Sequence, residues 1–279
     1  MCTGARSHSG EVVKAAAGPA GASLLAVDVG NTNTVLGLWR GDELARSWRL
    51  TTRRDATADE IAISIRGLFA AGPTPEELGP MRVIVASVVP SLKFSLRQAL
   101  RQILEREPLF VEPGVKTGMP ILYDMPQEVG ADRIVNAVAA FERLGGPCIV
   151  VDFGTATTFD VVTPKGEYAG GVIVPGISIS AEALFEKAAR LWRVEIKRPE
   201  RVVGKTTAGA IQSGLYFGYL SLVDGMIDRI AAEIGGKPGV IATGGLAELF
   251  GGGSERIGEV DPLLTLRGLR LIDERNRGG

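Results

Sequence analysis

Two short segments place an aspartate just before a glycine and a group of small polar residues. The first reads Asp28-Val29-Gly30-Asn31-Thr32, and the second reads Asp152-Phe153-Gly154-Thr155. A carboxylate repels phosphates unless a divalent cation or its waters lie between them. The glycine lets backbone amides approach a phosphate, and threonine and asparagine add neutral donors. The two segments together predict a site that holds a nucleotide triphosphate.

Structural alternatives exist for these segments. D-x-G-x-T can be a tight hairpin whose Asx or threonine hydrogen bonds only stabilise the turn. The second copy, and a third glycine turn at residues 242–245, favour phosphate binding. A rival phosphate loop at Gly204-Lys205-Thr206 lacks the leading glycine, because Pro199 stands there, and charged residues precede it. A P-loop fold is therefore not expected.

A further group with reactive potential opens a predicted helix at Gly130-Ala131-Asp132-Arg133. Asp132 could accept a proton from an attacking hydroxyl, and Arg133 could hold a carboxylate or phosphate through two parallel hydrogen bonds. The alternative makes Asp132 a helix N-cap and Arg133 a solvated residue of the first turn. Spacing alone favours that alternative.

Composition limits the classes of function. The 31 basic and 32 acidic residues leave a net charge of −1, which argues against binding nucleic acid or anionic membranes by bulk electrostatics. His8 is the sole histidine, so histidine-based triads and zinc sites are close to excluded. Cys2 and Cys148 indicate a reducing, cytoplasmic compartment. No apolar run approaches the ~20 residues that a membrane span requires.

The reactive segments must be positioned by the elements around them. Residues 24–39 and 148–162 resemble each other at a constant offset, and each reads as a buried strand, a turn and a second β-branched strand. Such a repeat predicts two similarly built units that face each other. Elsewhere strands alternate with helices, which indicates an α/β fold with covered sheets.

Several of the other elements can be placed in advance. Thr57 and Glu60 are spaced as a capping box before a helix. Strands are predicted at 44–50, 82–89 and 240–243, and helices at 92–104, 132–144, 178–191 and 207–234. The last helix holds four glycines, which indicate either a subunit interface or an internal helix crossing. Residues 1–23 are expected to be a disordered extension.

Six segments of the chain together resemble type III pantothenate kinases. They are DVGNTNT (28–34), YDMPQEVGADR (123–133), DFGTATTFDVV (152–162), GGVIVPGI (170–177), GKTTAGAIQSGLYFGY (204–219) and ATGG (242–245). The resemblance runs from about residue 24 to residue 276 and keeps the family's order. It departs at Met125, Thr206 and Trp192, where the family commonly has asparagine, asparagine and proline.

The resemblance implies an actin, hexokinase and Hsp70 type of fold, with ribonuclease-H-like domains at 24–125 and 126–276 and a nucleotide cleft between them. It implies transfer of the ATP γ-phosphate to the primary hydroxyl of pantothenate in a homodimer, with Asp132 as the catalytic base. Asp28 would lie near Mg²⁺, and Asp152 would hold a monovalent cation, K⁺ or NH₄⁺. The residues expected to bind ATP are Asp28, Val29, Gly30, Asn31, Thr32, Asn33, Thr34, Val35 and Thr155. Those expected to bind pantothenate are Tyr123, Gly130, Ala131, Asp132, Arg133 and Thr207.

Two alternative functions remain open at this stage. One is a kinase of the same fold that acts on another small hydroxyl or carboxylate substrate. The other is a regulator without catalytic activity built on the same scaffold. Retention of Asp28, Asp132 and Asp152 argues against the second alternative.

Overall fold

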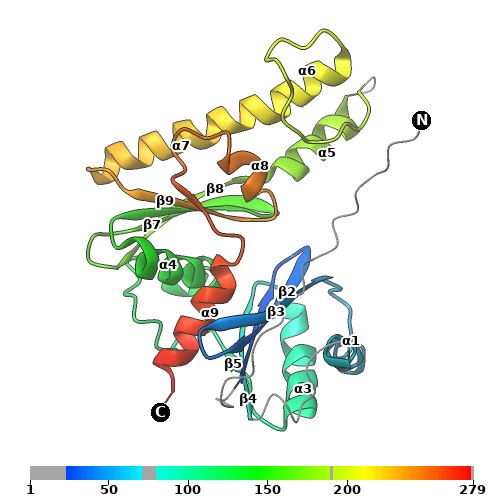
Figure 1. Cartoon of the computed structure of the whole chain (residues 1–279), viewed down its shortest axis with the longest axis vertical. Coiled ribbons are helices and arrows are strands. Elements are labelled where there is room, and N and C mark those ends of the chain that lie inside the picture. Colours follow the sequence, from blue (N-terminus) through cyan, green and yellow to red (C-terminus); the bar gives the residue numbers. More distant parts are fainter. Residues whose placement is uncertain (1–22, 71–79, 189–190, 278–279) are drawn as a thin grey trace, which may run out of the picture.

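The structure is a computed structural model that describes residues 23–70, 80–188 and 191–277. Over these ranges the chain forms two five-stranded sheets, one in each half, with helices between and around them (Figure 1). The predicted disordered extension, apart from Ser23, lies outside the described residues. In the described residues no helix is both long and apolar enough to cross a membrane.

The first sheet is built on the first predicted hairpin. Its strand order is β3-β2-β1-β4-β5, with β1 antiparallel to β2 and parallel to β4. Leu24 and Leu25, neighbours on β1, are both buried because helices cover both faces of this central strand. The strands are β1 (Ser23–Val29), β2 (Asn33–Arg40), β3 (Glu43–Thr51), β4 (Met81–Ser87) and β5 (Leu109–Phe110).

The second sheet repeats the topology of the first. Read from its β8 edge, its order is β8-β7-β6-β9-β10, with β6 antiparallel to β7 and parallel to β9. Each strand thus occupies the place of the strand five positions earlier in the chain, which confirms the predicted duplication. The strands are β6 (Cys148–Phe153), β7 (Ala156–Val162), β8 (Tyr168–Pro175), β9 (Gly239–Gly244) and β10 (Glu259–Val260).

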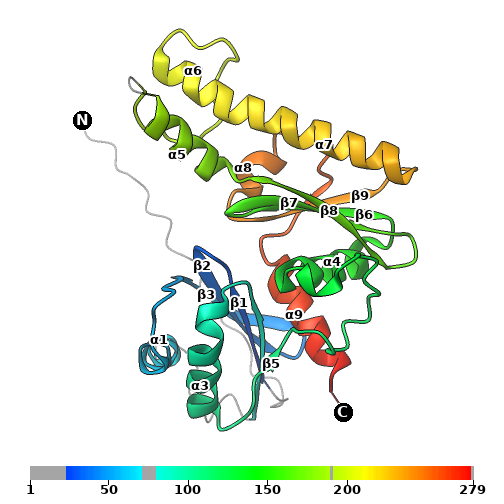
Figure 2. The same cartoon turned by 180° about the vertical axis from the view of Figure 1, so that it is seen from behind.

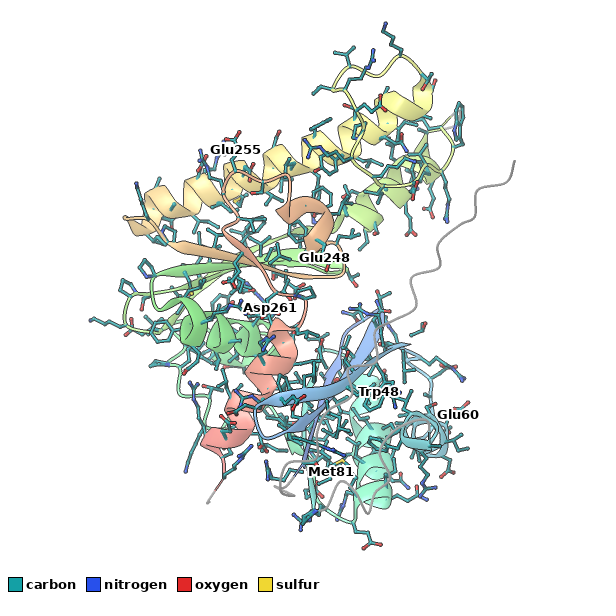
Figure 3. The ribbon with its side chains drawn as sticks, viewed as in Figure 1. Trp48, Glu60, Met81, Glu248, Glu255 and Asp261 are labelled. Atoms are coloured by element: carbon teal, nitrogen blue, oxygen red, sulfur yellow. The ribbon has the colours of Figure 1, made fainter. Side chains whose placement is uncertain are left out.

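Two helices, α1 (Ala58–Ala70) and α3 (Lys93–Leu104), cover one face of the first sheet. The predicted capping box begins α1: the Thr57 amide donates to Glu60 Oε2 at 2.9 Å, and the Glu60 amide donates to Thr57 Oγ1 at 3.3 Å. Trp48, labelled in Figure 3, packs edge-on against Phe69 of α1 on this face. A short 3-10 turn (Pro90–Leu92) precedes α3.

The other face of the first sheet packs against α4 (Ala131–Leu144) and α9 (Leu264–Arg275), which lie between the two sheets (Figure 2). The helix α4 is buried on nearly all sides, because eight of its residues are buried. Asp261, labelled in Figure 3, precedes α9 and forms ion pairs with Arg143 and Arg267. These contacts connect the end of α4 and the start of α9 to the second sheet.

The outer face of the second sheet is covered by α7 (Tyr219–Ile234) and the short α8 (Ala247–Gly251), while α5 (Ile177–Lys187) and α6 (Thr207–Ser213) extend beyond the sheet (Figure 1). The single helix predicted over 207–234 is divided by a π-helical turn, Gly214–Gly218. Apart from the chain neighbours and the helix's own backbone, no described atom lies within 4 Å of the position that a Cβ would take at Gly214 or Gly218. For Gly214 and Gly218, the interpretation as an internal helix crossing is therefore wrong.

Candidate active site

The first hairpin carries the predicted ATP-binding residues at its turn. Between β1 and β2, the Gly30 amide donates to the Asn33 carbonyl at 3.0 Å, which closes the turn. Asn31 and Thr32 are exposed at its tip. The Thr52 amide donates to the Thr32 carbonyl at 2.9 Å, so the end of β3 supports the loop from behind. The chain thus presents backbone amides and small polar side chains beside Asp28.

The second hairpin is built in the same way and meets the first. The Gly154 amide donates to the Ala156 carbonyl at 3.1 Å. The hydroxyl groups of Thr32 and Thr155 are hydrogen-bonded at 2.8 Å, although 123 residues separate them in the chain. The two hairpin tips therefore close over the same space, one from each sheet.

The third glycine turn lies beside Asp152. Gly244 ends β9 next to Phe153 and has a φ of +94°, a conformation that favours glycine. A Cβ at this position would lie 2.4 Å from Asp152 Oδ1. The Ala-Thr-Gly-Gly segment thus lets its backbone approach the half-buried Asp152 carboxylate near the end of β6.

At the start of α4, the Asp132 side chain accepts a hydrogen bond from the backbone of its own helix. Gly130 is the N-cap, and the Arg133 amide donates to Asp132 Oδ1 at 2.8 Å. The N-cap alternative for Asp132 is therefore wrong, since Asp132 belongs to the first helical turn. A Cβ at Gly130 would lie 2.6 Å from Asp132 Oδ1, so the glycine leaves room for this carboxylate.

Burial and mutual repulsion couple the three predicted carboxylates. Burial raises the pKa of Asp28 well above its usual value, and the charges of Asp132 and Asp152 raise it further. Burial also raises the pKa of Asp132, and hydrogen bonding and charge at Arg133 partly oppose this effect. Burial and the charge of Asp132 raise the pKa of Asp152 to about 7. These interactions between charges, with the contact between the two hairpin tips, place Asp28, Asp132 and Asp152 near one another between the sheets, in a region that we call the crevice.

Arg133 is buried beside a carboxylate that the sequence analysis did not select. Its Nε donates to Asp160 Oδ1 at 2.7 Å, and Asp160 is fully buried. The Tyr168 hydroxyl donates to Asp160 Oδ1 at 2.7 Å, and the Thr158 hydroxyl donates to Asp160 Oδ2 at 2.9 Å. The solvated alternative for Arg133 is therefore wrong. Asp160 could have been noticed as a charged residue within the apolar strand Ala156–Val162.

One nitrogen of this buried guanidinium remains available. Arg133 Nη2 is buried and has no hydrogen-bond partner in the described part of the chain. A buried donor without a partner is costly, so it indicates a position where a ligand oxygen can bind. Tyr123 lies nearby, with its ring centre 6.4 Å from that of Tyr168. Tyr123 and Arg133 can therefore line one substrate subsite.

Asn136 connects the crevice to α9. Its Nδ2 donates to Asp152 Oδ2 at 3.1 Å, and its Oδ1 accepts from the Thr265 hydroxyl at 2.7 Å. The amide orientation follows from these two partners. Asn136 is buried, and its hydrogen bond orients the Asp152 carboxylate. The other carboxylate oxygen, Asp152 Oδ1, faces Gly244.

Thr207 lies apart from the other predicted substrate residues. It is exposed at the start of α6, at the end of the second unit farthest from the first sheet (Figure 1). Within one chain the structure does not bring Thr207 to Arg133 or Tyr123.

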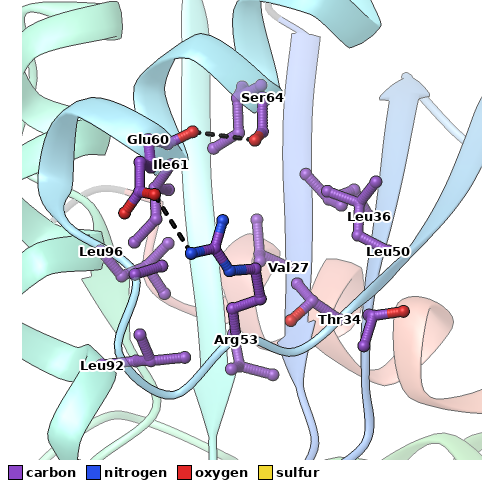
Figure 4. A pocket seen from close by; sticks show the side chains of 14 residues that line it. Val27, Thr34, Leu36, Leu50, Arg53, Glu60, Ile61, Ser64, Leu92 and Leu96 are labelled. Carbon is purple, nitrogen blue, oxygen red and sulfur yellow. Dashed lines mark hydrogen bonds and ion pairs between the residues drawn. The ribbon is translucent and has the colours of Figure 1, made fainter.

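One cavity borders the first hairpin, and another borders the start of α4. One of about 100 Å³ lies between the first sheet and helices α1 and α3, beyond Val27 and Val29 and hence on the face opposite Asp28 (Figure 4). Arg53 and Glu60 form an ion pair among its lining residues, which are otherwise mostly apolar. A cavity of about 520 Å³ borders Gly130 and Ala131 and extends toward Glu112 and Gln127. Only the second cavity touches predicted substrate residues.

The described residues contain no cluster of three or more His, Cys, Asp or Glu side chains arranged to hold a metal ion. Mg²⁺ commonly binds through one or two carboxylates, several waters and substrate phosphates, so the single carboxylate of Asp28 is compatible with it. The raised pKa of Asp28 and of Asp152 shows that each carboxylate would gain from a nearby cation.

Comparison with known proteins gives the family of the chain. The family model described as "Type III pantothenate kinase" matches residues 24–229. A type III pantothenate kinase from Koribacter versatilis is 56% identical over 91% of this chain and 96% of its own length. One from Anaeromyxobacter sp. (strain Fw109-5) is 58% identical over 91% of this chain and its full length.

Solved structures show the same fold at low sequence identity. A protein assigned to the Baf family of transcriptional activators, from Campylobacter jejuni, has a TM-score of 0.56 at 20% identity and covers 90% of this chain and 98% of its own. MreB 5 of Spiroplasma citri, bound to AMPPNP, has a TM-score of 0.51 at 10% identity and covers 93% of this chain and 98% of its own. The predicted α/β fold of the actin and hexokinase type is confirmed, and the chain belongs to the type III pantothenate kinase family.

Proposed function

We propose that this protein transfers the γ-phosphoryl group of ATP to the primary hydroxyl of pantothenate, the first step toward coenzyme A. The observation that carries the proposal is the crevice in which Asp28, Asp132 and Asp152 approach one another under two hairpins that touch at Thr32 and Thr155. Membership of the family supplies the substrate, which the geometry alone does not identify.

The hairpin residues 28–35 are the proposed phosphate site. The backbone amides that follow Gly30 at the hairpin tip, with the hydroxyl groups of Thr32 and Thr155, donate to the triphosphate. Mg²⁺, when bound near Asp28, neutralises charge that gathers on the phosphate oxygens. Asp28 is suited to this place because a cation offsets the repulsion it receives from Asp132 and Asp152.

Asp132 is the proposed proton acceptor. The bond from the γ-phosphorus to the β–γ bridging oxygen breaks, and ADP leaves with that electron pair. The pantothenate hydroxyl oxygen forms the new bond to phosphorus and gives its proton to Asp132. In a loose transition state this proton moves late, so Asp132 first orients the hydroxyl through a hydrogen bond.

Arg133 and Tyr123 are the proposed anchors of pantothenate. Arg133 Nη2, buried and unpartnered in the described residues, can donate to the substrate carboxylate, while Asp160 holds Nε. The Tyr123 ring contributes an apolar face beside it. Asp152, oriented by Asn136, is the proposed ligand of a monovalent cation, K⁺ or NH₄⁺.

A homodimer is part of this proposal. Gly214, Gly218 and Leu222 lie exposed on α7 and the turn before it, and Val203 in the segment before α6 is 78% exposed. An apolar surface with small residues suits close contact with a second copy of the chain. Thr207 would then reach the pantothenate site of the partner subunit, which accounts for its distance from Arg133 within one chain.

The test is ADP release from ATP and Mg²⁺ with a panel of acceptors, with and without K⁺. We expect release that depends on pantothenate and increases with K⁺, and none above background with acetate or hexoses. Turnover of another acceptor in place of pantothenate would contradict the substrate assignment. Turnover of none would contradict a kinase function.

A further inference from the structure

The crevice gathers negative charge and offers few cations to balance it. Asp28, Asp132 and Asp152 are all half-buried there, and a triphosphate adds several further charges. Arg133 is already held by Asp160, and Arg54 donates to Asn31 Oδ1 at 3.1 Å at the hairpin tip. A cationic side chain in addition to these two arginines is available on β3, the strand that pairs with β2 of the first hairpin.

Arg49 occupies such a position on β3. Asp28 on β1 pairs with Val35 on β2, and Val35 pairs with Arg49. Residues paired directly across neighbouring strands project from the same face of a sheet. The three residues thus form one row across the sheet, with Arg49 about 10 Å from Asp28 at the Cα atoms, two strand spacings away.

This row faces the crevice. Val35 packs against the core that includes α4 and α9, the helices that lie between the two sheets. Successive residues of a strand alternate between its faces. On β3 the neighbours Trp48 and Leu50 pack into the opposite core, under α1 and α3. Arg46 stacks over Trp48 and so also lies on that opposite face.

The guanidinium of Arg49 is accessible. Arg49 is exposed, and no hydrogen bond or ion pair is assigned to it in the described ranges of the chain. Its charge nevertheless acts on Asp28: burial, Asp132 and Asp152 raise the pKa of Asp28, and Arg49 lowers it. The end of its strand is fixed to the phosphate hairpin by a hydrogen bond between the Thr34 and Thr52 hydroxyls at 2.9 Å.

We propose that Arg49 is a catalytic residue whose guanidinium contacts the non-bridging oxygens of the γ-phosphoryl group while it moves from ADP to the acceptor. The inference rests on the proposed kinase function and adds a residue to it. A planar guanidinium can donate two parallel hydrogen bonds to phosphate oxygens, and charge on these oxygens builds up in the transition state. The side chain neither gains nor loses a proton in this role.

The test compares four proteins with ATP, Mg²⁺, K⁺ and pantothenate. They are the wild type, Arg49→Met, Arg49→Lys and the control Arg46→Met, which removes an arginine from the same strand but from its opposite face. We expect kcat of Arg49→Met to fall by about 100-fold or more, as for loss of one preorganised transition-state donor. The pantothenate KM should change little, and Arg49→Lys should retain an intermediate rate because it keeps the charge but not the paired donors.

A second readout separates a catalytic from a structural role. Calorimetric titration should show that Arg49→Met loses affinity for ATP while ADP, which lacks the γ-phosphate, binds as to the wild type. In a fifth protein, Arg49→Ala, methylguanidine should restore part of the rate, and it should have no effect on Arg46→Met. Thermal unfolding of each variant checks that the exposed substitution leaves the fold intact.

The outcomes distinguish this inference from the proposed function. An active wild type with Arg49→Met within about threefold of its kcat overturns the role of Arg49 alone. Equal losses in Arg49→Met and Arg46→Met also overturn it. A wild type that does not phosphorylate pantothenate overturns the proposed function and this inference together.

Discussion

At Asp152, burial and neighbouring carboxylates act in the same direction on one proton equilibrium. The pKa of Asp152 in the folded state is about 7, whereas the pKa of an aspartate in an unfolded chain is about 3.9. The stability that depends on a protonated Asp152 is therefore present below pH 4. It is lost as the pH rises from about 4 through 7, because the unfolded carboxyl ionises first. Above pH 7 the buried negative charge remains a cost that a bound cation can offset.

We predict that Asp152→Asn raises the melting temperature at pH 8 in a buffer without K⁺ or NH₄⁺. A gain of about 2 °C or more is expected for a chain of this size, since the variant buries no charge. At pH 4 the wild type and the variant should melt at similar temperatures. Added K⁺ should stabilise the wild type and leave the variant unchanged. If the wild type and the variant melted at the same temperature at pH 8 as well as at pH 4, the charge of Asp152 would carry no cost, and this prediction would be contradicted.

The reactive residues differ in how far the sequence could predict them. Asp28 and Asp152 stand in local patterns that repeat, so their shared place could be inferred before the structure. Asp160 lies 27 residues from Arg133 in the chain, and only the folded sheet brings them together. The position of Arg49 depends on strand register, which no local pattern around it specifies.

At the scale of elements, the first turn of α4 positions Asp132. We predict that Gly130→Ala lowers kcat by about 10- to 100-fold, because the new Cβ would lie 2.6 Å from Asp132 Oδ1 and displace it. The melting temperature should change little, since the atom that must move, Asp132 Oδ1, is at the end of a side chain. Gly67→Ala in α1 is the matched control, because among the described residues no atom outside its own helix backbone lies within 4 Å of its new Cβ. Identical rates for the two variants would contradict the prediction.

Elements with strong local signals were predicted and others were not. The hairpins, the capping box and the amphipathic helix after residue 92 follow from periodicity and turn residues alone. The helix α9 was not predicted, since Gly268 at its centre lowers helix propensity. A Cβ at Gly268 would lie 2.1 Å from the Val135 carbonyl oxygen, so the glycine allows close packing on α4. That reason belongs to tertiary structure and is absent from the local pattern.

At the scale of the molecule, the predicted division at residue 125 stays a prediction that the packing complicates. The helix α9 follows the second sheet in the chain and packs on β1 and β4 of the first. With α4 it forms one core with residues of both sheets. The duplication of topology could be inferred from the repeat, but this return of the C-terminal helix could not.

We predict that the active site of one subunit is completed by the other. Asp132→Asn should be inactive, and Thr207→Arg should fold but block the pantothenate site of the partner subunit. After subunit exchange in an equal mixture, half of the dimers carry one intact site, so about a quarter of wild-type activity should return. Thr207→Arg with wild-type activity, or a mixture that regains none, would contradict a shared site.

The most direct test of the whole account is the turnover of Asp132→Asn with ATP, Mg²⁺, K⁺ and saturating pantothenate. The account predicts a loss in kcat of about 100-fold or more, with a melting temperature no lower than that of the wild type and with ATP still bound, since asparagine has the same shape as aspartate but cannot accept the proton. A kcat within about threefold of the wild type would contradict the role of Asp132 in the proposed mechanism.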